Sequence, residues 1–198
     1  MAAKCGCSRP TKGQQCDWLE YKSARVEGLY YGATFQANLV LTDWLNTQPL
    51  CTPFVCLGDG HDGVWNVFEV VRSSSERLEI LDWYHLKENL FKIGGSIKRL
   101  HQAEAWWQGG VAQAKALFQD CKLDQARKFC NYLNHHRQRI VNYAYFQAEG
   151  IPIGSGAVES SIKQIDARMK LTGTQWKAEN VPKVLSVRCA YLNGQLDF

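Results

Sequence analysis

The sequence predicts an α/β fold with an all-helical insertion, on three features of its hydrophobic pattern. Two short apolar runs, at 53–57 (PFVCL) and 77–81 (RLEIL), are bounded by Pro, Gly and Asp, as is typical of buried parallel strands. A helical pattern at 63–72 connects them, and this order predicts a parallel sheet with a right-handed crossover. From residue 85 to about 149, strand patterns cease and long helical patterns follow.

The rest of the chain completes the predicted organisation. Alternating residues at 17–31 predict one or two further strands, and a short helix is expected at 34–46. Two helices are expected near the end, at about 157–170 and 179–191. The predicted segments are a loose lead-in (1–16), the first part of the α/β core (17–84), a helical insertion (85–149) and the C-terminal helices of the core (150–198).

Composition limits the class of protein. A chain of 198 residues with 45% hydrophobic residues suits a folded core and excludes a disordered class. Its apolar runs are much shorter than the roughly 20 residues that a membrane helix needs, and its first residues contain no apolar signal core. The eight Cys residues follow no regular spacing, so we expect free thiols in a reducing, cytoplasmic environment and no membrane partner.

Positive charge is concentrated in the helical region. The net charge is only +4, but residues 84–147 contain ten Lys and Arg against four Asp and Glu. Trp and Tyr side chains are interspersed with these cations, an arrangement that suits contact with a phosphate backbone. Solvated faces of ordinary surface helices explain the same charges, and both interpretations stay open.

The first candidate site residue is Asp59, in the stretch GDGHDG. It follows a predicted buried strand, and ligands of open α/β sheets gather at the carboxyl ends of strands. Gly58 and Gly60 are expected to leave room beside the carboxylate for a phosphate or a metal ion. The alternative is a turn aspartate, because Asp-Gly is a common turn pair. Asp62 is expected to cap the helix that follows.

Asp82 and His85 form the second candidate, in the stretch LDWYHL. Asp82 ends the second predicted parallel strand, and the two residues share a helix face if the helix begins at Trp83. The alternative is an N-cap aspartate beside a surface histidine.

The third candidate is Glu159, which opens the helix after IPIGSG. Two Gly residues there allow the backbone to approach another surface closely, which suits a site more than an ordinary helix start. Helical spacing predicts a core-facing apolar stripe beside a charged one. The apolar stripe is Val158, Ile162, Ile165 and Met169, and the charged stripe is Glu159, Lys163, Asp166 and Lys170. Lys163, Arg168 and Lys170 are candidate DNA contacts, although Glu159 and Lys163 also make an ordinary surface pair.

Four stretches in this order resemble the catalytic core of a known family. They are GDGHDGVWN, LDWYHLKENL, IGSGAVESSIKQIDARMKLTGTQW and LSVRCAYLNGQLD. Together they resemble insertion-sequence transposases of the ISKra and ISLre kind, distant relatives of the Mutator group, from about residue 17 to the end. The resemblance implies an RNase H-like fold, an Asp, Asp, Glu triad that holds two divalent metals, and a helical insertion before the Glu.

The family's residues transfer individually to this chain. Asp59 matches the second Asp of the triad and Glu159 matches the Glu, while Asp82 and His85 match the D-x-x-H signature of these relatives. The resemblance also implies Mg²⁺ or Mn²⁺ as cofactor, transposon ends and target DNA as partners, and homo-oligomers on DNA. Two metal ions roughly 3.5–4 Å apart stabilise the attacking and leaving oxygens of displacement at phosphorus, and hard cations prefer carboxylate ligands.

One part of the family pattern is missing. The family has its first Asp in a D-G strand ahead of a W-x-E-x-K strand, and the latter matches Trp18, Glu20 and Lys22. Ahead of it this chain reads only MAAKCGCSRPTKGQQC. We therefore expect an incomplete RNase H-like fold whose central sheet lacks its first strand, in a truncated transposase that is inactive alone. The alternatives are a non-catalytic DNA-binding remnant and an unrelated RNase H-like nuclease.

Overall fold

The computed structural model describes residues 2–6, 18–26, 30–106, 110–154, 156–171 and 174–196 of the chain. The fold is mixed α/β and divides into two compact units, each described by itself below. The sheet–helix unit comprises Met1–Thr52, Asn66–Ser74 and Gly156–Phe198. The helical unit comprises Pro53–Trp65 and Ser75–Ser155. No helix within the described ranges is both long and apolar enough to cross a membrane.

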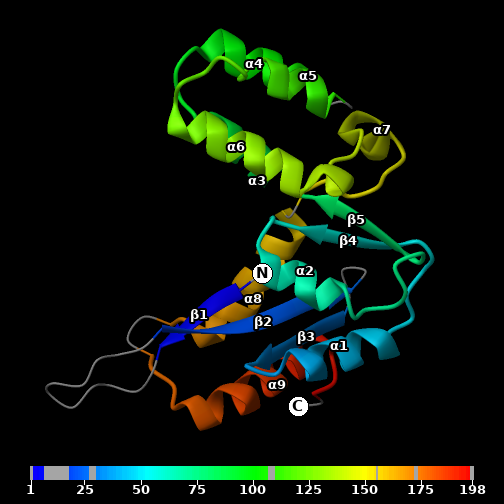
Figure 1. Ribbon diagram of the computed structural model, residues 1–198. Helices are drawn as coiled ribbons and strands as arrows, with labels where there is room; N and C mark the ends of the chain where they lie inside the picture. Colours follow the sequence, from blue (N-terminus) through cyan, green and yellow to red (C-terminus); the bar gives the residue numbers. More distant parts are fainter. Residues whose placement is uncertain are drawn as a thin grey trace, which may run out of the picture. The chain divides into compact units, whose positions relative to one another are not determined.

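The sheet–helix unit is built on an antiparallel sheet of strands β1 (Ala2–Gly6), β2 (Trp18–Val26) and β3 (Tyr30–Phe35) (Figure 1). β2 lies in the centre, with Ala2 opposite Lys22 on one side and Val26 opposite Tyr30 on the other. The prediction of a loose lead-in is therefore wrong for the residues of β1. The prediction that the sheet begins with the W-x-E-x-K strand is also wrong, because the backbone of β1 pairs along that strand.

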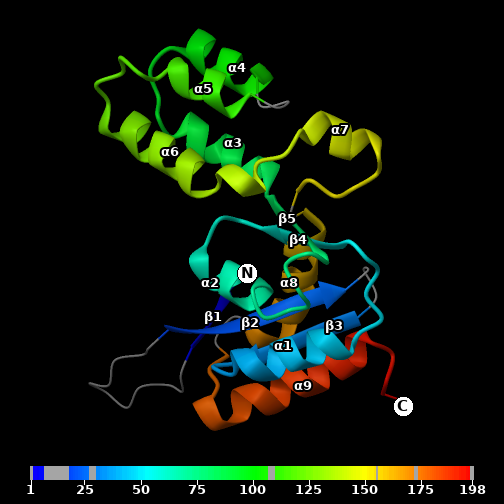
Figure 2. The same ribbon diagram turned by 45° about the vertical axis from the view of Figure 1, so that its right-hand side comes forward.

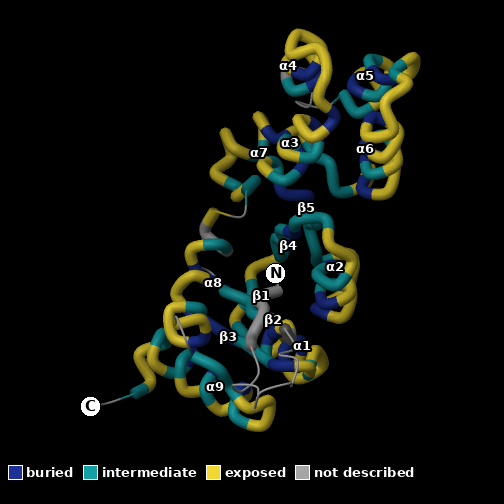
Figure 3. Tube along the Cα trace, turned by 90° about the vertical axis from the view of Figure 1, so that its left-hand side faces the viewer, coloured by how far each residue is buried: buried dark blue, intermediate teal, exposed yellow. Residues whose placement is uncertain are grey.

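Helices cover both faces of this sheet. Helices α8 (Gly156–Met169) and α9 (Val181–Leu192) lie on one face, and α1 (Asn38–Thr47) lies on the other (Figure 3). Gly32 of β3 allows α1 to approach closely, because a Cβ there would overlap the Trp44 ring. The expected helices at 34–46 and 157–170 are thus present, although β3 continues to Phe35 before α1 begins.

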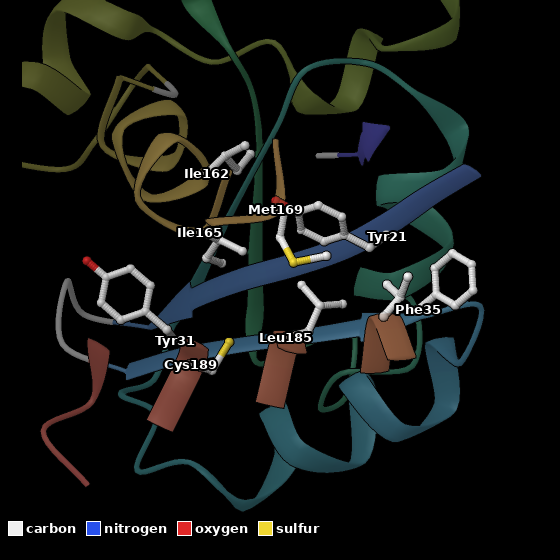
Figure 4. Packing of buried hydrophobic residues seen from close by; sticks show 9 residues of the cluster. Tyr21, Tyr31, Phe35, Ile162, Ile165, Met169, Leu185 and Cys189 are labelled. Carbon is white, nitrogen blue, oxygen red and sulfur yellow. The ribbon is translucent and has the colours of Figure 1, made fainter. Parts of the chain in front are cut away.

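The core of the sheet–helix unit lies between the sheet and the pair α8 and α9 (Figure 4). Its members are buried side chains of β2, β3, α8 and α9, namely Tyr21, Tyr31, Phe35, Ile162, Ile165, Met169, Val181, Leu185 and Cys189. The predicted apolar stripe of α8 is confirmed at Ile162, Ile165 and Met169, while the side chain of Val158 lies outside the described residues. Burying such side chains contributes about 1.5–3 kcal/mol each.

Side-chain hydrogen bonds join α8 to this sheet across the whole sequence. The Tyr21 hydroxyl donates to Asp166 Oδ1 at 2.5 Å, over a separation of 145 residues. The Tyr31 hydroxyl donates to Gln164 Oε1 at 2.7 Å. These two bonds help to orient α8, because they attach neighbouring positions of one turn to two different strands, β2 and β3.

The helical unit contains a parallel pair of strands, β4 (Phe54–Gly58) and β5 (Arg77–Leu81). Both strands lie within one residue of their predicted bounds, and their parallel pairing is confirmed. Short helices follow β5 (Figure 2). They are α3 (Trp83–Phe91), α4 (Ile97–Trp106), α5 (Val111–Ala116), α6 (Asp124–His135), the 3-10 helix η1 (Arg137–Arg139) and α7 (Tyr143–Ala148).

The connecting helix α2 (Asp62–Phe68) is shorter than the predicted helix at 63–72. Asn46 of α1 accounts for the early end. Its side-chain amide donates to Val70 O at 3.2 Å and accepts from Arg72 N at 3.0 Å. Arg72 has a φ of 55°, which a continuing helix does not allow. The side chain of Asn46 thus binds backbone groups that a longer α2 would use for its own hydrogen bonds.

Candidate functional site

Asp59 lies immediately after β4, as predicted, and forms a tight local turn. Its Oδ1 accepts a hydrogen bond from His61 N at 3.0 Å. Gly63 N in turn donates to His61 Nδ1 at 3.1 Å. The predicted cap residue Asp62 is instead the first residue of α2, so the imidazole of His61 binds the early helix backbone in its place. The turn orders the Asp59 carboxylate at the carboxyl end of a parallel strand.

The two glycines beside Asp59 have a different role from the predicted one. A Cβ at Gly58 would meet the Trp65 ring at 2.8 Å, and a Cβ at Gly60 would overlap the Tyr132 hydroxyl. Gly60 also has a φ of 90°, which side-chain-bearing residues rarely adopt. The expectation that these glycines leave room for a phosphate or a metal ion is therefore wrong. They make room for two aromatic side chains of the protein.

Helix α6 and its C-cap residue supply three side chains near this turn that the sequence analysis missed. Tyr132 contacts the backbone at Asp59 and Gly60, with 3.5 Å between its hydroxyl and Asp59 O. His135 Nε2 lies 3.3 Å from Asp62 Oδ1. His136 packs against the Tyr132 ring, with ring centroids 4.6 Å apart. α6 buries Ala126, Phe129 and Leu133, but nothing in its sequence indicates that Tyr132 contacts the turn at Asp59.

His136 is a buried histidine in an unfavourable place for a positive charge. The pKa of His136 is lowered from 6.5 to about 4, chiefly by burial and also by the neighbouring His135 and Arg139. Its Nδ1 has no hydrogen-bond partner among the described residues. Arg139 is fixed nearby, since its guanidinium lies 4.2 Å from the Trp65 ring centroid and its Nε donates to Glu79 Oε2 at 2.8 Å. The imidazole is therefore neutral at physiological pH.

Two expected features of Asp82 and His85 are present together. The residues share one face at the start of α3, and Asp82 is the N-cap of that helix. α3 begins at Trp83, and the fully buried Asp82 caps it by accepting from Tyr84 N at 2.7 Å and His85 N at 3.0 Å. His85 Nδ1 lies 3.6 Å from Asp82 Oδ1, longer than a hydrogen bond. His85 is half-buried rather than a surface residue. The carboxylate thus has a structural role within its own helix.

The half-buried Tyr132 and the buried Tyr143 lie in the electrostatic field of these carboxylates. Burial raises the pKa of Tyr132, and the charge of Asp59 raises it further. Burial likewise raises the pKa of Tyr143, with Tyr132 and Asp82 adding to the effect, while its hydroxyl donates to Leu81 O at 2.9 Å. Both hydroxyls therefore stay protonated and act as donors. Asp59 and Asp82 of the helical unit both lie close enough to Tyr132 to raise the pKa of its hydroxyl.

The segment before α8 is bound to the start of α3. Trp83 N donates to Ile153 O at 2.9 Å. A Cβ at Gly154 would overlap the Tyr84 ring, so this glycine permits the predicted close approach, and the surface approached is the first turn of α3. Gly156 has nothing within 4 Å of its ideal Cβ position. Only one of the two glycines therefore serves close packing within the described residues.

Glu159 lies in the first turn of α8 and is half-buried. It belongs to the sheet–helix unit, whereas Asp59, Asp82 and His85 belong to the helical unit. The structure therefore brings Asp82 and His85 into direct contact and describes Asp59 and Glu159 in separate units.

The three candidate DNA-binding cations of α8 do not form one group. Lys163 and Lys170 are exposed and lie seven residues apart, which places them on one helix face. Lys170 Nζ is 2.7 Å from Asp166 Oδ2. Arg168 lies on another face and lines a groove beside α9. Trp176 lines the same groove, packs against the core and donates from Nε1 to Met169 O at 3.1 Å.

Carboxylates are suitable ligands for a divalent cation, but too few of them lie together among the described residues. Within the described ranges, no group of three or more His, Cys, Asp or Glu side chains is placed to hold a metal ion. The strand β1, AAKCG, contains no carboxylate. A site for two hard cations needs several oxygen ligands, and the described residues do not complete one.

The buried thiols support their expected role as small hydrophobic groups. Burial raises the pKa of Cys56 to about 12 and the pKa of Cys189 to about 11. A thiol with such a pKa is inert at neutral pH, because the thiolate is the reactive form. Both thiols are therefore protonated at neutral pH.

Comparison of the chain with known protein families, curated proteins and solved structures finds no match.

Proposed function

We propose that this chain derives from a DDE-type transposase of an insertion sequence of the ISKra and ISLre kind, with an RNase H-like core, and that it binds DNA without cleaving it. The observation that carries the proposal is the pairing of β1 with β2. β1 lies directly beside the W-x-E-x-K strand, with Gly6 opposite Trp18 and Lys4 opposite Glu20. In the resembled family a D-G strand precedes the W-x-E-x-K strand in the sequence, and in this chain the strand that precedes it carries Cys5 and Gly6.

With Cys5 and Gly6 in place of the D-G pair, the proposed triad lacks one metal ligand. Asp59 and Glu159 alone supply two carboxylates, and Asp82 already caps α3 with its Oδ1. Loss of a ligand charge weakens the binding of a hard cation such as Mg²⁺. We therefore propose that the chain retains the DNA-binding role of its relatives and has lost the metal-dependent reaction.

α8 is the proposed DNA contact of the sheet–helix unit. Lys163 and Lys170 are exposed on one face, and Arg168 is exposed on another. Lysine and arginine that neutralise phosphates release counterions, so such binding weakens steeply as salt increases. Because Lys170 is already paired with Asp166, Lys163 is the sharper test of this contact.

The test is fluorescence anisotropy with a labelled DNA duplex, with and without Mg²⁺, over a series of salt concentrations. We expect salt-dependent binding that does not require Mg²⁺. Lys163→Glu should weaken it by about fivefold and reduce the salt slope by about one, as expected for loss of one phosphate contact. Binding that is insensitive to salt would contradict the proposal.

The basic helices of the helical unit are a second candidate contact. The observation that favours them is the exposure of many of their cations. The exposed members are Lys92, Lys98, Arg99, Lys122, Arg127, Lys128 and Arg137. Lys98→Glu is the matched variant, since it makes the same charge change on an exposed helix position of the other unit. A loss with Lys98→Glu and none with Lys163→Glu would assign DNA binding to the basic helices instead.

A further inference from the structure

The sheet–helix unit has a groove that shares only Arg168 with the proposed DNA contact. It lies between the end of α8 and the outer face of α9 and has a volume of about 670 Å³. That volume is within the range of roughly 300–1,000 Å³ typical of ligand pockets. The ten lining residues are Arg168, Leu171, Thr174, Trp176, Lys183, Val184, Val187, Arg188, Tyr191 and Leu196.

α9 explains why this groove is apolar. Its inner face buries Val181, Leu185 and Cys189 in the core. A surface helix normally carries polar residues on its other side, but Val187 is 60% exposed and Tyr191 is 52% exposed. α9 thus has a second apolar face in addition to the one that it packs against the sheet. Clustered apolar side chains of this kind mark interaction surfaces.

The described charged residues of the groove are cations. They are Arg168, Lys183 and Arg188, and the described lining residues include no carboxylate. Arg188 is held in place, because its Nη2 donates to Gln164 O at 2.7 Å and its guanidinium lies 5.1 Å from the Tyr191 ring centroid. Lys183 and Arg168 are exposed. An occupant with apolar and negatively charged groups would complement this surface.

We propose that this groove binds an acidic amphipathic helix of a partner protein, with apolar side chains on the floor and carboxylates on the three cations. Helices bind apolar grooves through anchors spaced at i, i+3 or i+4, and i+7. Four of the lining residues are aliphatic, at 171, 184, 187 and 196, which suits leucine-like anchors more than the flat faces of nucleobases. The Trp176 indole N–H already donates to Met169 O. The inference is independent of the proposed DNA contact through Lys163.

The test uses the full chain and a fluorescein-labelled helical peptide of about 16 residues, with Leu along one face and Glu on both flanks. Fluorescence anisotropy should give saturable binding. A peptide with Lys in place of each Glu should bind at least about tenfold more weakly, because its charges then repel the three cations. Failure of the chain to bind the acidic peptide, or equal binding of both peptides, would overturn the proposal.

Val187→Glu and Val40→Glu are a matched pair of variants. Val187 lines the groove and is 60% exposed, whereas Val40 lies on α1, outside the lining, and is 59% exposed. Val187→Glu should weaken binding of the acidic peptide at least about tenfold, because it places a like charge on the floor. Val40→Glu should leave binding unchanged, and circular dichroism establishes that both variants fold. Equal weakening by the two variants would overturn the proposal.

A labelled single-stranded oligonucleotide separates the competing occupant. If the oligonucleotide binds, Val187→Glu abolishes that binding and the acidic peptide does not compete, the groove is a nucleic-acid site and the proposal fails. Loss of duplex binding in Lys163→Glu with peptide binding unchanged supports the independence of the two surfaces.

Discussion

Helix α8 in the sheet–helix unit and the turn around Asp59 in the helical unit are held by different side-chain contacts. In the sheet–helix unit, hydroxyl groups of β2 and β3 donate to side chains of α8, as in the bonds from Tyr21 to Asp166 and from Tyr31 to Gln164. In the helical unit, aromatic side chains pack directly on glycines, as Tyr132 does on Gly60 and Trp65 does on Gly58. Hydrogen bonds can be removed one at a time at modest cost, whereas a steric fit fails when a single methyl group is added.

The largest effect is therefore expected at Gly60. Gly60→Ala combines a positive φ of 90° with overlap between the new Cβ and the Tyr132 hydroxyl. We expect the free energy of unfolding of the helical unit to fall by about 3 kcal/mol. Urea unfolding, together with hydrogen exchange of the α6 amides, measures this change.

Gly94→Ala is the matched control within the same unit. Gly94 also has a positive φ, of 68°, but nothing lies within 4 Å of its ideal Cβ position. Only the backbone cost remains, so we expect a loss of about 1 kcal/mol. Equal losses at the two glycines would show that Tyr132 does not press on the turn.

The second prediction concerns pH and the helical unit. The pKa of His136 is about 4 in the folded protein against an ordinary value of 6.5. Between these values the unfolded chain binds a proton that the folded chain does not, so stability falls as pH falls. From pH 7.5 to pH 5 the expected contribution is a loss of about 2 kcal/mol.

His136→Phe isolates this contribution, since phenylalanine keeps an aromatic ring beside Tyr132 and cannot be protonated. Its unfolding free energy should depend less steeply on pH than that of the wild type over this interval. Parallel pH profiles for the two proteins, measured by urea unfolding, would contradict the burial of a neutral histidine.

The third prediction tests the hydrogen bonds of the sheet–helix unit. Tyr21→Phe removes a donor to the carboxylate of Asp166, and we expect a loss of about 1.5 kcal/mol, because hydrogen bonds to charged groups are the stronger ones. Tyr31→Phe removes a donor to the neutral amide of Gln164 and should cost about 0.5–1 kcal/mol. A larger loss for Tyr31→Phe, measured by urea unfolding, would reverse the assigned order.

Patterning predicted the regular parts of both units well. The parallel pair β4 and β5, the start of α3 at Trp83 and the buried stripe of α8 all follow from local spacing. β1 was missed because AAKCG shows no clear alternation of apolar and polar residues. Its strand conformation is stabilised by pairing with β2, which the local sequence does not indicate.

Predictions for the candidate site failed where long-range packing determines the local structure. The glycines around Asp59 correctly indicated a close approach, but no local signal identified Tyr132, 72 positions beyond Gly60, as the group that approaches. His136 was missed for the same reason, since its neighbours Trp65 and Tyr132 come from two different helices. The early end of α2 likewise depends on Asn46.

We propose that the chain does not cleave DNA because β1 lacks a carboxylate. The most direct measurement is nicking of supercoiled plasmid in the presence of Mn²⁺. The wild type should show no activity above the metal-free background, Cys5→Asp should gain activity, and adding Glu159→Gln should remove it. Lys4→Asp, which introduces a carboxylate one position earlier, should gain none. Cleavage by the wild-type chain that Glu159→Gln abolishes would contradict the claim.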